Sequence, residues 1–467
     1  MRYRLCTLVM AAGLAGIAPS PLAAQRQAMP RDSSLHDTTL ANGLQVLVVG
    51  HHAVPLAKVA VFVRTGAFTQ DSGDEGVSHL YEHMLFKGYE GGDRAFINES
   101  SDLKAQYNGF TSDEVVGYYL DVPARNIRGA IKLLSRAIRN PHFDNDLLTA
   151  ERQVVFNEFD RDMADPVQQL DRNVLQRLWT TGWRRKNPLG EAWAIAAATP
   201  ARLTSIYHRY YIPNNAAVIV SGDVSVPDVL DAVNKYFGDW DRAPDPSIAH
   251  PVVSVPARDK NAAVMMTGNV KDVTVEIAWQ GPSTDDHCRA SCAADVFVSL
   301  VNDAGSHFQQ TLVRSGLFQG LQFDYGRRRY VGAITLIGRT TPDSLAHALA
   351  ALKRELPRLA RADAFDSDEI ADGRQGRRVA HALEEESGSA RPTELGYWWG
   401  EAGLDYYRQY DAGIAAVTAA DLQQFARDYI DGRPSVTGVL SAIGATPSPM
   451  LALRAFVARD STTAAAP

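Results

Sequence analysis

Residues 76–88 read GVSHLYEHMLFKG and contain the pattern around which the rest of the chain can be understood. Two histidines flank a carboxylate in the order His-x-x-Glu-His. If the segment is helical, His79 and His83 lie on one face, so both imidazoles can reach the same ion. Glu82 lies one turn from His79 and points from the side at the space where a water on that ion would sit. A histidine pair on a helix also occurs by coincidence on protein surfaces. The rest of the sequence is therefore needed to distinguish a metal site from a chance pair.

The overall composition is that of an ordinary globular protein. The chain has 467 residues, of which 45% are hydrophobic and 22% are charged. This length is enough for about two to four domains with substantial cores. The net charge is −7 and no basic block stands out, so nucleic acid is not an expected partner.

Residues 1–24 have the features of a secretory signal peptide. Arg2 and Arg4 precede an apolar run at residues 5–18, and small residues lead to a predicted cut after Ala24. The alternative is a retained N-terminal anchor, but the run is short for a membrane span and no later segment reaches that length. We expect a periplasmic or secreted protein without stable membrane insertion.

Cys288 and Cys292 are the two cysteines that remain after the predicted cut. They are four residues apart on a predicted helix at 287–302, which is poor spacing for a structural disulfide framework. Together with His287 they are also candidates for soft metal ligands. We interpret them as two buried cysteines on a helix face, so the core is not expected to depend on a disulfide.

The end of the first half of the chain resembles the end of the second half. Residues 199–223 and 418–442 align without gaps, and each has a polar start, spaced apolar positions and a closing apolar strand. Residues 59–66 and 274–281 match at nearly the same offset. These matches indicate duplication of a unit of about two hundred residues, a size typical of a domain.

The duplication predicts the domain organisation. We expect an N-terminal domain at 25–245, a homologous C-terminal domain at 246–460 and a disordered tail at 461–467, with a proline-containing linker at 241–255. Strand pairs mixed with long helices predict an α+β fold. Each half would be a mostly antiparallel sheet with helices packed on one face.

The second half lacks the histidine motif. Its corresponding positions are occupied by Ala294, Phe297 and Val298. One ion per chain is therefore expected, and it would be held by the first half.

The third metal ligand is predicted on a long helix at 144–163. A catalytic zinc takes three protein ligands and leaves one position for water. At 100° per residue, one narrow apolar stripe of this helix consists of Leu147, Glu151, Val154, Val155 and Glu158. Two carboxylates buried in such a stripe would cost several kcal/mol unless a cation or strong hydrogen bonds compensate them. A zinc site explains both carboxylates, and salt bridges to nearby arginines are the alternative.

The paired motifs resemble those of a known family. GVSHLYEHMLFKG and, about seventy residues later, ERQVVFNEFDRDMADP closely resemble the pitrilysin family of zinc peptidases, or inverzincins, and the similarity covers most of the mature chain. The resemblance implies one Zn²⁺ bound by His79, His83 and Glu158. It also implies that Glu82 is the general base and that Glu151 supports the site by contacting a ligand or the base.

The segment NGFTSDEVVGYY is similar to the family's substrate-binding edge strand. Asn108 and Thr111 match the family pattern, whereas Gly109 replaces the usual alanine and Val116 the usual threonine. The resemblance therefore implies that Asn108 and Thr111 bind substrate.

One part of the family pattern is incomplete. In the second half, family members carry an arginine and, seven residues later, a tyrosine that both reach the substrate carbonyl. Arg314 matches the arginine and is the predicted substrate-binding residue of this half. Leu321 stands seven residues on, and the next tyrosine is Tyr325.

The predicted function is zinc-dependent hydrolysis of peptides or unfolded segments in an enclosed chamber. Because the arginine–tyrosine pair is incomplete, we expect a heterodimer in which a homologous partner subunit supplies it, as in some bacterial family members. The alternatives are a non-catalytic assembly or binding subunit of the same fold, and a self-sufficient homodimeric peptidase in which Tyr325 or another group replaces the tyrosine. The intact Glu82 argues against the non-catalytic alternative.

Overall fold

The computed structural model describes residues 35–89, 96–286, 288–386, 391–444 and 448–458 of the chain. The predicted signal peptide and the predicted disordered tail lie outside the described residues. Within them, no helix is both long enough and apolar enough to cross a membrane.

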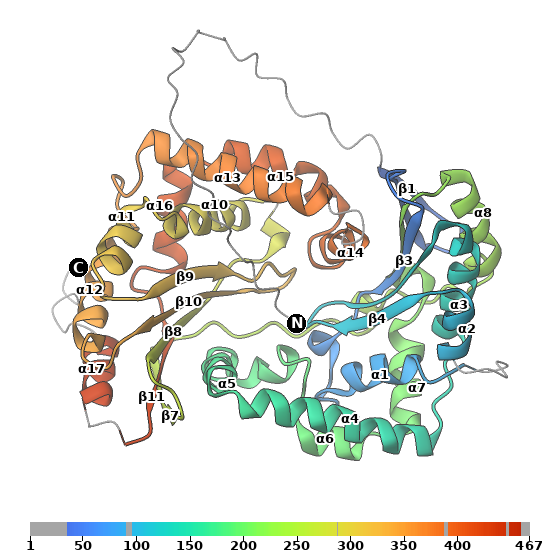
Figure 1. The fold of residues 1–467 in the computed structure, drawn as a ribbon, viewed down its shortest axis with the longest axis horizontal. Coiled ribbons are helices and arrows are strands. Elements are labelled where there is room, and N and C mark those ends of the chain that lie inside the picture. The colour runs from blue at the N-terminus through green and yellow to red at the C-terminus, as the bar shows by residue number, and fades with distance from the viewer. Residues whose placement is uncertain (1–34, 90–95, 287, 387–390, 445–447, 459–467) are drawn as a thin grey trace, which may run out of the picture. The chain divides into compact units, whose positions relative to one another are not determined.

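The first half of the chain forms one sheet with its helices (Figure 1). Its elements are β1 (Leu35–Thr39), β2 (Gln45–Gly50), β3 (Leu56–Val63), η1 (Ala67–Thr69), α1 (Val77–Leu85), α2 (Phe96–Asp102), β4 (Gln106–Thr111), β5 (Val116–Pro123), α3 (Ile127–Arg139), α4 (Asn145–Ala164), α5 (Pro166–Trp179), η3 (Thr180–Arg185), α6 (Ala192–Ala197), α7 (Pro200–Tyr210), β6 (Ala216–Gly222) and α8 (Val226–Phe237). The strand order is β1-β2-β6-β3-β5-β4.

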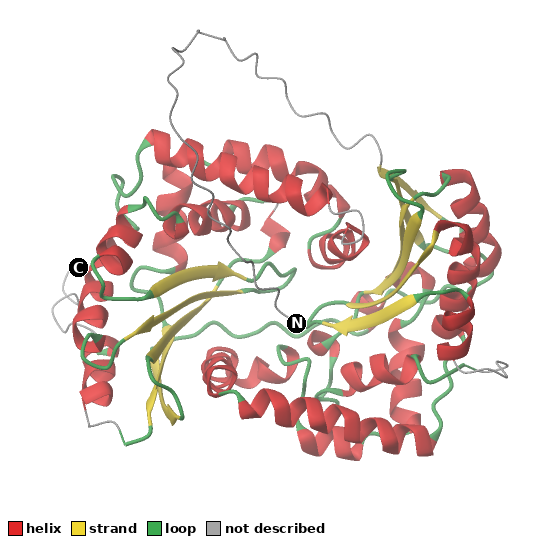
Figure 2. Cartoon of the chain, in the orientation of Figure 1, coloured by secondary structure: helices red, strands yellow, loops and turns green. Residues whose placement is uncertain are grey.

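The second half forms another sheet with its own helices (Figure 2). Its elements are α9 (Pro246–Ala249), β7 (Ala262–Gly268), β8 (Val273–Gln280), α10 (Ala290–Asn302), α11 (His307–Gln309), the π-helical turn η6 (Gln310–Arg314), β9 (Gly320–Tyr325), β10 (Ala333–Thr340), α12 (Leu345–Arg358), α13 (Ser367–Glu386), α14 (Arg391–Glu401), α15 (Leu404–Ala416), α16 (Ala419–Tyr429), β11 (Ser435–Ala442) and α17 (Ser448–Val457). The strand order is β7-β11-β8-β10-β9.

Both sheets are mostly antiparallel. The parallel pairs are β2 with β6 and β7 with β11, and the remaining neighbours run antiparallel. The predicted α+β fold of two related halves is confirmed.

The duplicated segments form the same helix–strand unit in each half. α7 leads into β6, and α16 leads into β11. Both helices begin in the same way, because Thr199 accepts a hydrogen bond from Arg202 N at 3.3 Å and Thr418 accepts one from Asp421 N at 3.2 Å. A threonine at this position satisfies a backbone N–H that has no partner within the helix. The sequence similarity therefore reflects a shared local structure.

Each sheet has helices of its own half on one face and one helix of the other half on the opposite face. α3 and α8 pack on the first sheet, whereas α14 of the second half contacts β3 and β6. Conversely, α5 of the first half contacts β7, β8 and β11. The sequence predicted helices on one face of each sheet, and the structure has a helix on the second face as well. This double coverage explains why β3 and β8 are buried along nearly their whole length instead of alternating with exposed positions.

Two glycines allow these exchanged helices to pack closely. A Cβ atom on Gly396 of α14 would lie 2.0 Å from Phe62 Cζ. A Cβ atom on Gly438 of β11 would lie 2.5 Å from Val174 Cγ2 of α5. These distances are well below ordinary van der Waals contact, so both positions require glycine as the structure stands.

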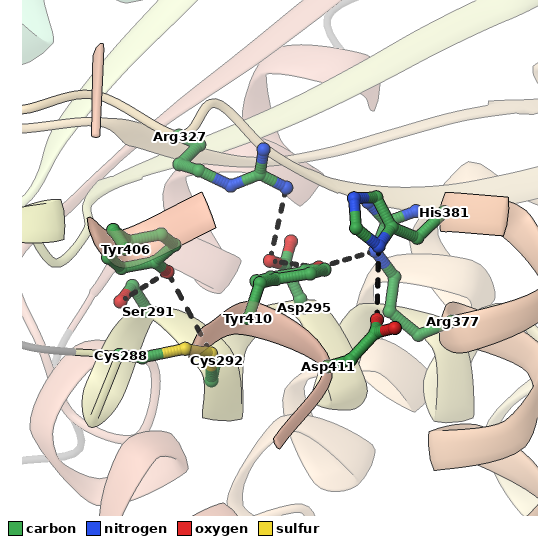
Figure 3. The surroundings of a disulfide bond; sticks show 10 residues. All are labelled: Cys288, Ser291, Cys292, Asp295, Arg327, Arg377, His381, Tyr406, Tyr410 and Asp411. Carbon is green, nitrogen blue, oxygen red and sulfur yellow. Dashed lines mark hydrogen bonds and ion pairs between the residues drawn. A yellow bond between two sulfur atoms is a disulfide. The ribbon is translucent and has the colours of Figure 1, made fainter. Parts of the chain in front are cut away.

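The two cysteines differ from the prediction. Cys288 precedes the first residue of α10 and adopts a φ of 64°, so the pair does not share a helix face. The Cα atoms lie 4.9 Å apart and the two residues form a disulfide (Figure 3). Tyr406 lies beside the disulfide, and its hydroxyl donates to Ser291 Oγ at 2.9 Å. Cys292 is buried on α10 as predicted, but the interpretation of both cysteines as lying on one helix face without a disulfide is wrong, because the helix begins later than predicted.

Candidate metal centre

Helix α1 carries the His-x-x-Glu-His motif and begins at a glycine that cannot easily be replaced. Gly76 has a φ of 90°, and a Cβ atom there would lie 2.8 Å from Leu189 O. α1 then packs against α4, the helix that bears the two predicted carboxylates. The tight entry to α1 and the contact with α4 together set the direction of the histidine side chains.

The three predicted ligands converge in the structure. The Nε2 atoms of His79 and His83 are 3.2 Å apart, and Glu158 Oε2 lies 3.5 Å from His79 Nε2 and 3.7 Å from His83 Nε2. Within the described part of the chain, this is the one group of three or more His, Cys, Asp or Glu residues arranged to hold a metal ion.

These distances fit a zinc ion. Two ligand atoms at about 2.1 Å from a tetrahedral zinc lie about 3.4 Å from each other, which is within the range found here. Burial, and then the neighbouring His83, lower the pKa of His79 to about 3, so this imidazole is neutral as a metal ligand must be. Two nitrogens and one carboxylate oxygen are a donor set that suits zinc.

Glu151 holds one of the histidines in place. His83 Nδ1 lies 2.9 Å from Glu151 Oε1, and Lys87 Nζ lies 2.7 Å from Glu151 Oε2. A hydrogen bond at Nδ1 leaves Nε2 of the same ring free to face an ion, which is the usual role of a carboxylate behind a histidine ligand. Glu151 and Glu158 therefore occupy different positions around the same centre.

The predicted apolar stripe of α4 is only partly correct. Glu151 and Val155 are buried, but Leu147 and Val154 are 40% and 42% exposed. The buried face of α4 consists of Leu148, Glu151 and Val155, so it is rotated about the helix axis away from the predicted stripe. This rotation turns Glu151 towards α1. The exposed side of α4 thus carries apolar residues that the sequence pattern assigned to the core.

Glu82 is placed by strand β4. Thr111 Oγ1 donates a hydrogen bond to Glu82 Oε2 at 2.9 Å. Gly109 lies against the same carboxylate, since a Cβ atom at position 109 would be 2.6 Å from Glu82 Oε1. Burial raises the pKa of Glu82 to about 7, whereas His83 and the Thr111 hydrogen bond act in the opposite direction. A carboxyl group with a pKa near neutrality can both accept and release a proton.

Strand β4 is one of the two outer strands of the first sheet and pairs with β5 on its inner side. The side chain of Asn108 is exposed on it, and Asn108 Oδ1 accepts a hydrogen bond from Gly109 N at 2.9 Å. An outer strand offers backbone N–H and C=O groups to which an extended peptide can pair. Glu82 contacts this strand at Gly109 and Thr111.

The second-half residues singled out from sequence are not brought together. Arg314 is exposed at the end of η6 and makes no hydrogen bond or ion pair with another described residue. Tyr325 is buried, and its hydroxyl donates to Pro282 O at 3.0 Å. This bond commits Tyr325 to the interior of its own half, so it does not replace the missing tyrosine in this structure.

Tyr397 is a residue near the site that sequence reasoning missed. It lies on α14, and its ring stacks on Phe110 of β4 with the ring centroids 4.7 Å apart. Burial raises the pKa of Tyr397, and Glu82 is among the carboxylates that raise it further. No sequence motif marks this position, because only the packing of α14 on the first sheet brings it to β4.

Comparisons with known proteins give matches to both halves of the chain. Residues 45–192 match the family model described as Insulinase (Peptidase family M16), and residues 197–376 match the Peptidase M16 inactive domain. The chain is 26% identical over 274 residues to an Arabidopsis thaliana protein named "Probable mitochondrial-processing peptidase subunit beta", covering 57% of this chain and 51% of that protein. It is 28% identical over 205 residues to "Uncharacterized zinc protease YmxG" of Bacillus subtilis, covering 44% and 50%. The chain spans about half the length of these curated relatives.

A solved structure has the same fold. The crystal structure of a protease from Helicobacter pylori superposes with a TM-score of 0.77 at 20% sequence identity, covering 87% of this chain and 99% of that chain. Both halves described above therefore belong to a fold that is known from experiment.

Proposed function

Because the chain belongs to peptidase family M16, we propose that it is the zinc-bearing subunit of an endopeptidase that hydrolyses peptides or unfolded segments. The observation that carries the proposal is the convergence of the His79, His83 and Glu158 donor atoms next to the Glu82 carboxylate. A retired site would not need a carboxylate held by a dedicated hydrogen bond beside its ligand set.

The chain's own residues divide the work. His79, His83 and Glu158 hold the zinc, and Glu151 orients the His83 ring. When bound, zinc supplies Lewis-acid chemistry, polarising a water molecule and the scissile carbonyl. Glu82 takes the proton from the attacking water and passes it to the leaving amine. The β4 edge aligns the substrate as an added strand, with Asn108 and Thr111 beside it.

The second part of the proposal is a heterodimer. Arg314 and Tyr325 do not form a donor pair at the zinc site, and the developing oxyanion of the reaction needs such donors. A homologous partner subunit would supply them, and the two chains would enclose the substrate. We also propose that this assembly lies in the periplasm or outside the cell, because the chain carries a predicted signal peptide.

A self-sufficient peptidase is the second candidate, and one observation favours it. The second half of this same chain already brings Tyr397 to β4. Activity without a partner would point to this residue as a substitute for the missing tyrosine.

An activity assay separates these possibilities. The purified chain is incubated with an unstructured fluorogenic peptide, with and without a homologous chain that carries the arginine–tyrosine pair but lacks the histidine motif. The heterodimer predicts hydrolysis that is abolished by a chelator and that requires both chains. Strong chelator-sensitive hydrolysis by this chain alone would refute the heterodimer, and no hydrolysis under either condition would refute the peptidase.

Two variants test the assignment of roles. Glu82→Gln should retain zinc and lose turnover, because the amide cannot accept the proton. Glu158→Ala should lose zinc, measured by metal analysis after gel filtration. Turnover in the first variant or full zinc content in the second would contradict the assigned roles.

A further inference from the structure

The turn at residues 112–115, between β4 and β5, contains two acidic side chains that are almost completely buried. Asp113 and Glu114 are 6% and 5% exposed. Burying one carboxylate costs several kcal/mol unless charges or hydrogen bonds compensate it. This turn begins directly after Thr111, whose hydroxyl holds the Glu82 carboxylate at 2.9 Å.

The second half of the chain supplies part of the compensation. Arg328, in the loop between β9 and β10, donates a hydrogen bond to Asp113 and forms an ion pair with Glu401 at 3.2 Å. Glu114 accepts two hydrogen bonds from the backbone of the same loop, from Arg329 N at 2.6 Å and from Tyr330 N at 3.1 Å. The turn after β4 is therefore fixed by a loop that lies more than two hundred residues away in sequence.

The first half holds the same turn from the other side. Lys186 Nζ donates to Asp113 Oδ2 at 2.8 Å and to Val331 O at 2.6 Å, so it joins both loops. The backbone of η1 adds a bond from Phe68 N to Asp113 O at 2.6 Å. The ring of Phe68 in turn stacks on Tyr330, with centroids 4.5 Å apart.

β4 depends on this anchorage because it is an outer strand. Its inner side is paired with β5, and among the described residues no strand pairs with its other side, where the proposed peptide substrate would add. The position of its last residue, Thr111, is thus set by β5 and by the turn that follows. A turn released from its anchors would move Thr111, and the hydrogen bond to Glu82 would lengthen.

We propose that Arg328 is a positioning residue for the catalytic base, acting through Asp113 and Thr111 on Glu82. The half of the chain without the metal motif thereby takes part in the chemistry of the half that has it. This inference rests on the proposed peptidase function. It differs from a purely structural role, in which the ion cluster would stabilise the fold without affecting Glu82.

The test compares two adjacent arginines in the full chain, with the homologous partner added if activity requires it. Arg328→Gln removes the positive charge that pairs with Asp113 of the turn. Arg327→Gln is the matched control, because Arg327 is also paired with a carboxylate, Asp295 at 3.2 Å, and packs over Trp398, but it makes no hydrogen bond or ion pair with residues 112–115 among the described residues. Each variant is measured for kcat, KM, zinc content and thermal midpoint.

We expect Arg328→Gln to lower kcat by about tenfold or more, with KM changed less than about twofold and zinc content unchanged, because sub-ångström displacement of a reacting group is costly. Arg328→Lys should restore most of kcat, since it keeps the positive charge. Arg327→Gln should change kcat by less than about twofold even if it lowers the thermal midpoint.

A double-mutant cycle identifies the route. Thr111→Val should lower kcat by itself, and adding Arg328→Gln should then cost little more, because both changes break the same connection. The inference would be overturned if the kcat losses of Thr111→Val and Arg328→Gln were fully additive in the double variant. It would also be overturned if Arg327→Gln lowered kcat as much as Arg328→Gln does. If Arg328→Gln does not fold, Asp113→Asn is tested by the same criteria, as it weakens the ion pair and keeps the backbone bonds.

Different results would overturn the proposed peptidase function and the proposed role of Arg328. Wild-type protein that hydrolyses no peptide with or without its partner would overturn both the peptidase function and this inference. Active wild-type protein together with a fully active Arg328→Gln variant would overturn only the role of Arg328.

Discussion

Replacing Glu151 with alanine should weaken zinc binding without unfolding the protein. Glu151 Oε1 lies 2.9 Å from His83 Nδ1 and is the contact that sets the orientation of that ring. Losing a carboxylate behind a metal-binding histidine typically costs 10- to 100-fold in affinity, or about 1.4 to 2.8 kcal/mol.

The structure places the expected loss within that range. Little water can replace the carboxylate, because the Glu151 and His83 side chains are only 7% and 13% exposed, which favours the upper end. Lys87 lies 2.7 Å from Glu151 Oε2 and neutralises part of its charge, which favours the lower end. We therefore expect a loss of about 30-fold, close to 2 kcal/mol.

Competition with a chromophoric chelator measures the zinc Kd directly. Glu151→Gln keeps an acceptor for His83 Nδ1 and should lose about tenfold or less. Asp160→Asn, on the exposed side of α4, should leave the Kd unchanged. A Glu151→Ala variant with the wild-type Kd would show that His83 is oriented by its packing alone, and the reasoning would be refuted.

Three further predictions concern the base, the core and the metal. Gly109→Ala should displace the Glu82 carboxylate, since the new Cβ atom would lie 2.6 Å from Glu82 Oε1. We expect kcat to fall about tenfold with zinc retained. An unchanged kcat would show that the carboxylate can move aside without loss of activity. Burial, and then Asp171, raise the pKa of Glu276, so the folded state keeps a proton that the unfolded chain loses above pH 4.5. The free energy of unfolding should therefore fall as pH rises from about 5 to about 8, by up to about 1.4 kcal/mol per pH unit, and Glu276→Gln should flatten this slope in denaturant titrations; parallel slopes would contradict it. Restoring zinc to metal-stripped protein at about 100 times its Kd should add about 2.7 kcal/mol of stability, seen as a higher Tm that Glu158→Ala does not show.

Some features of this protein follow from local sequence. The spacing of His79 and His83 places both rings on one face of any helix, whatever the helix packs against, and the structure has that helix at α1. The Asn42-Gly43 pair predicts a turn between β1 and β2, and Gly43 has the positive φ of 90° that such a turn requires. The repeated helix–strand unit was readable because both copies keep the same apolar spacing.

Other features depended on contacts between distant segments. The pattern of α4 placed Glu151 and Glu158 in one stripe, but the contact of α4 with α1 brought Glu158 to the Nε2 atoms of both histidines and Glu151 to His83 Nδ1. Helical periodicity gives the relative angles of side chains and leaves the rotation of the whole helix open, which is why Leu147 and Val154 were expected inside. The partners of that helix lie elsewhere in the chain.

The exchange of helices between the halves was beyond the reach of sequence for the same reason. Nothing near Tyr397 or Arg328 in the chain marks them as neighbours of β4. They reach it because α14 packs on the first sheet and because the β9–β10 loop supplies charges to buried carboxylates. Sequence by itself determined the proposed metal ligands that share a helix and the candidate base between them, since backbone geometry fixes their spacing. Only the tertiary structure decided how the second half supports that base, since long-range packing and the compensation of buried charge have no local signature.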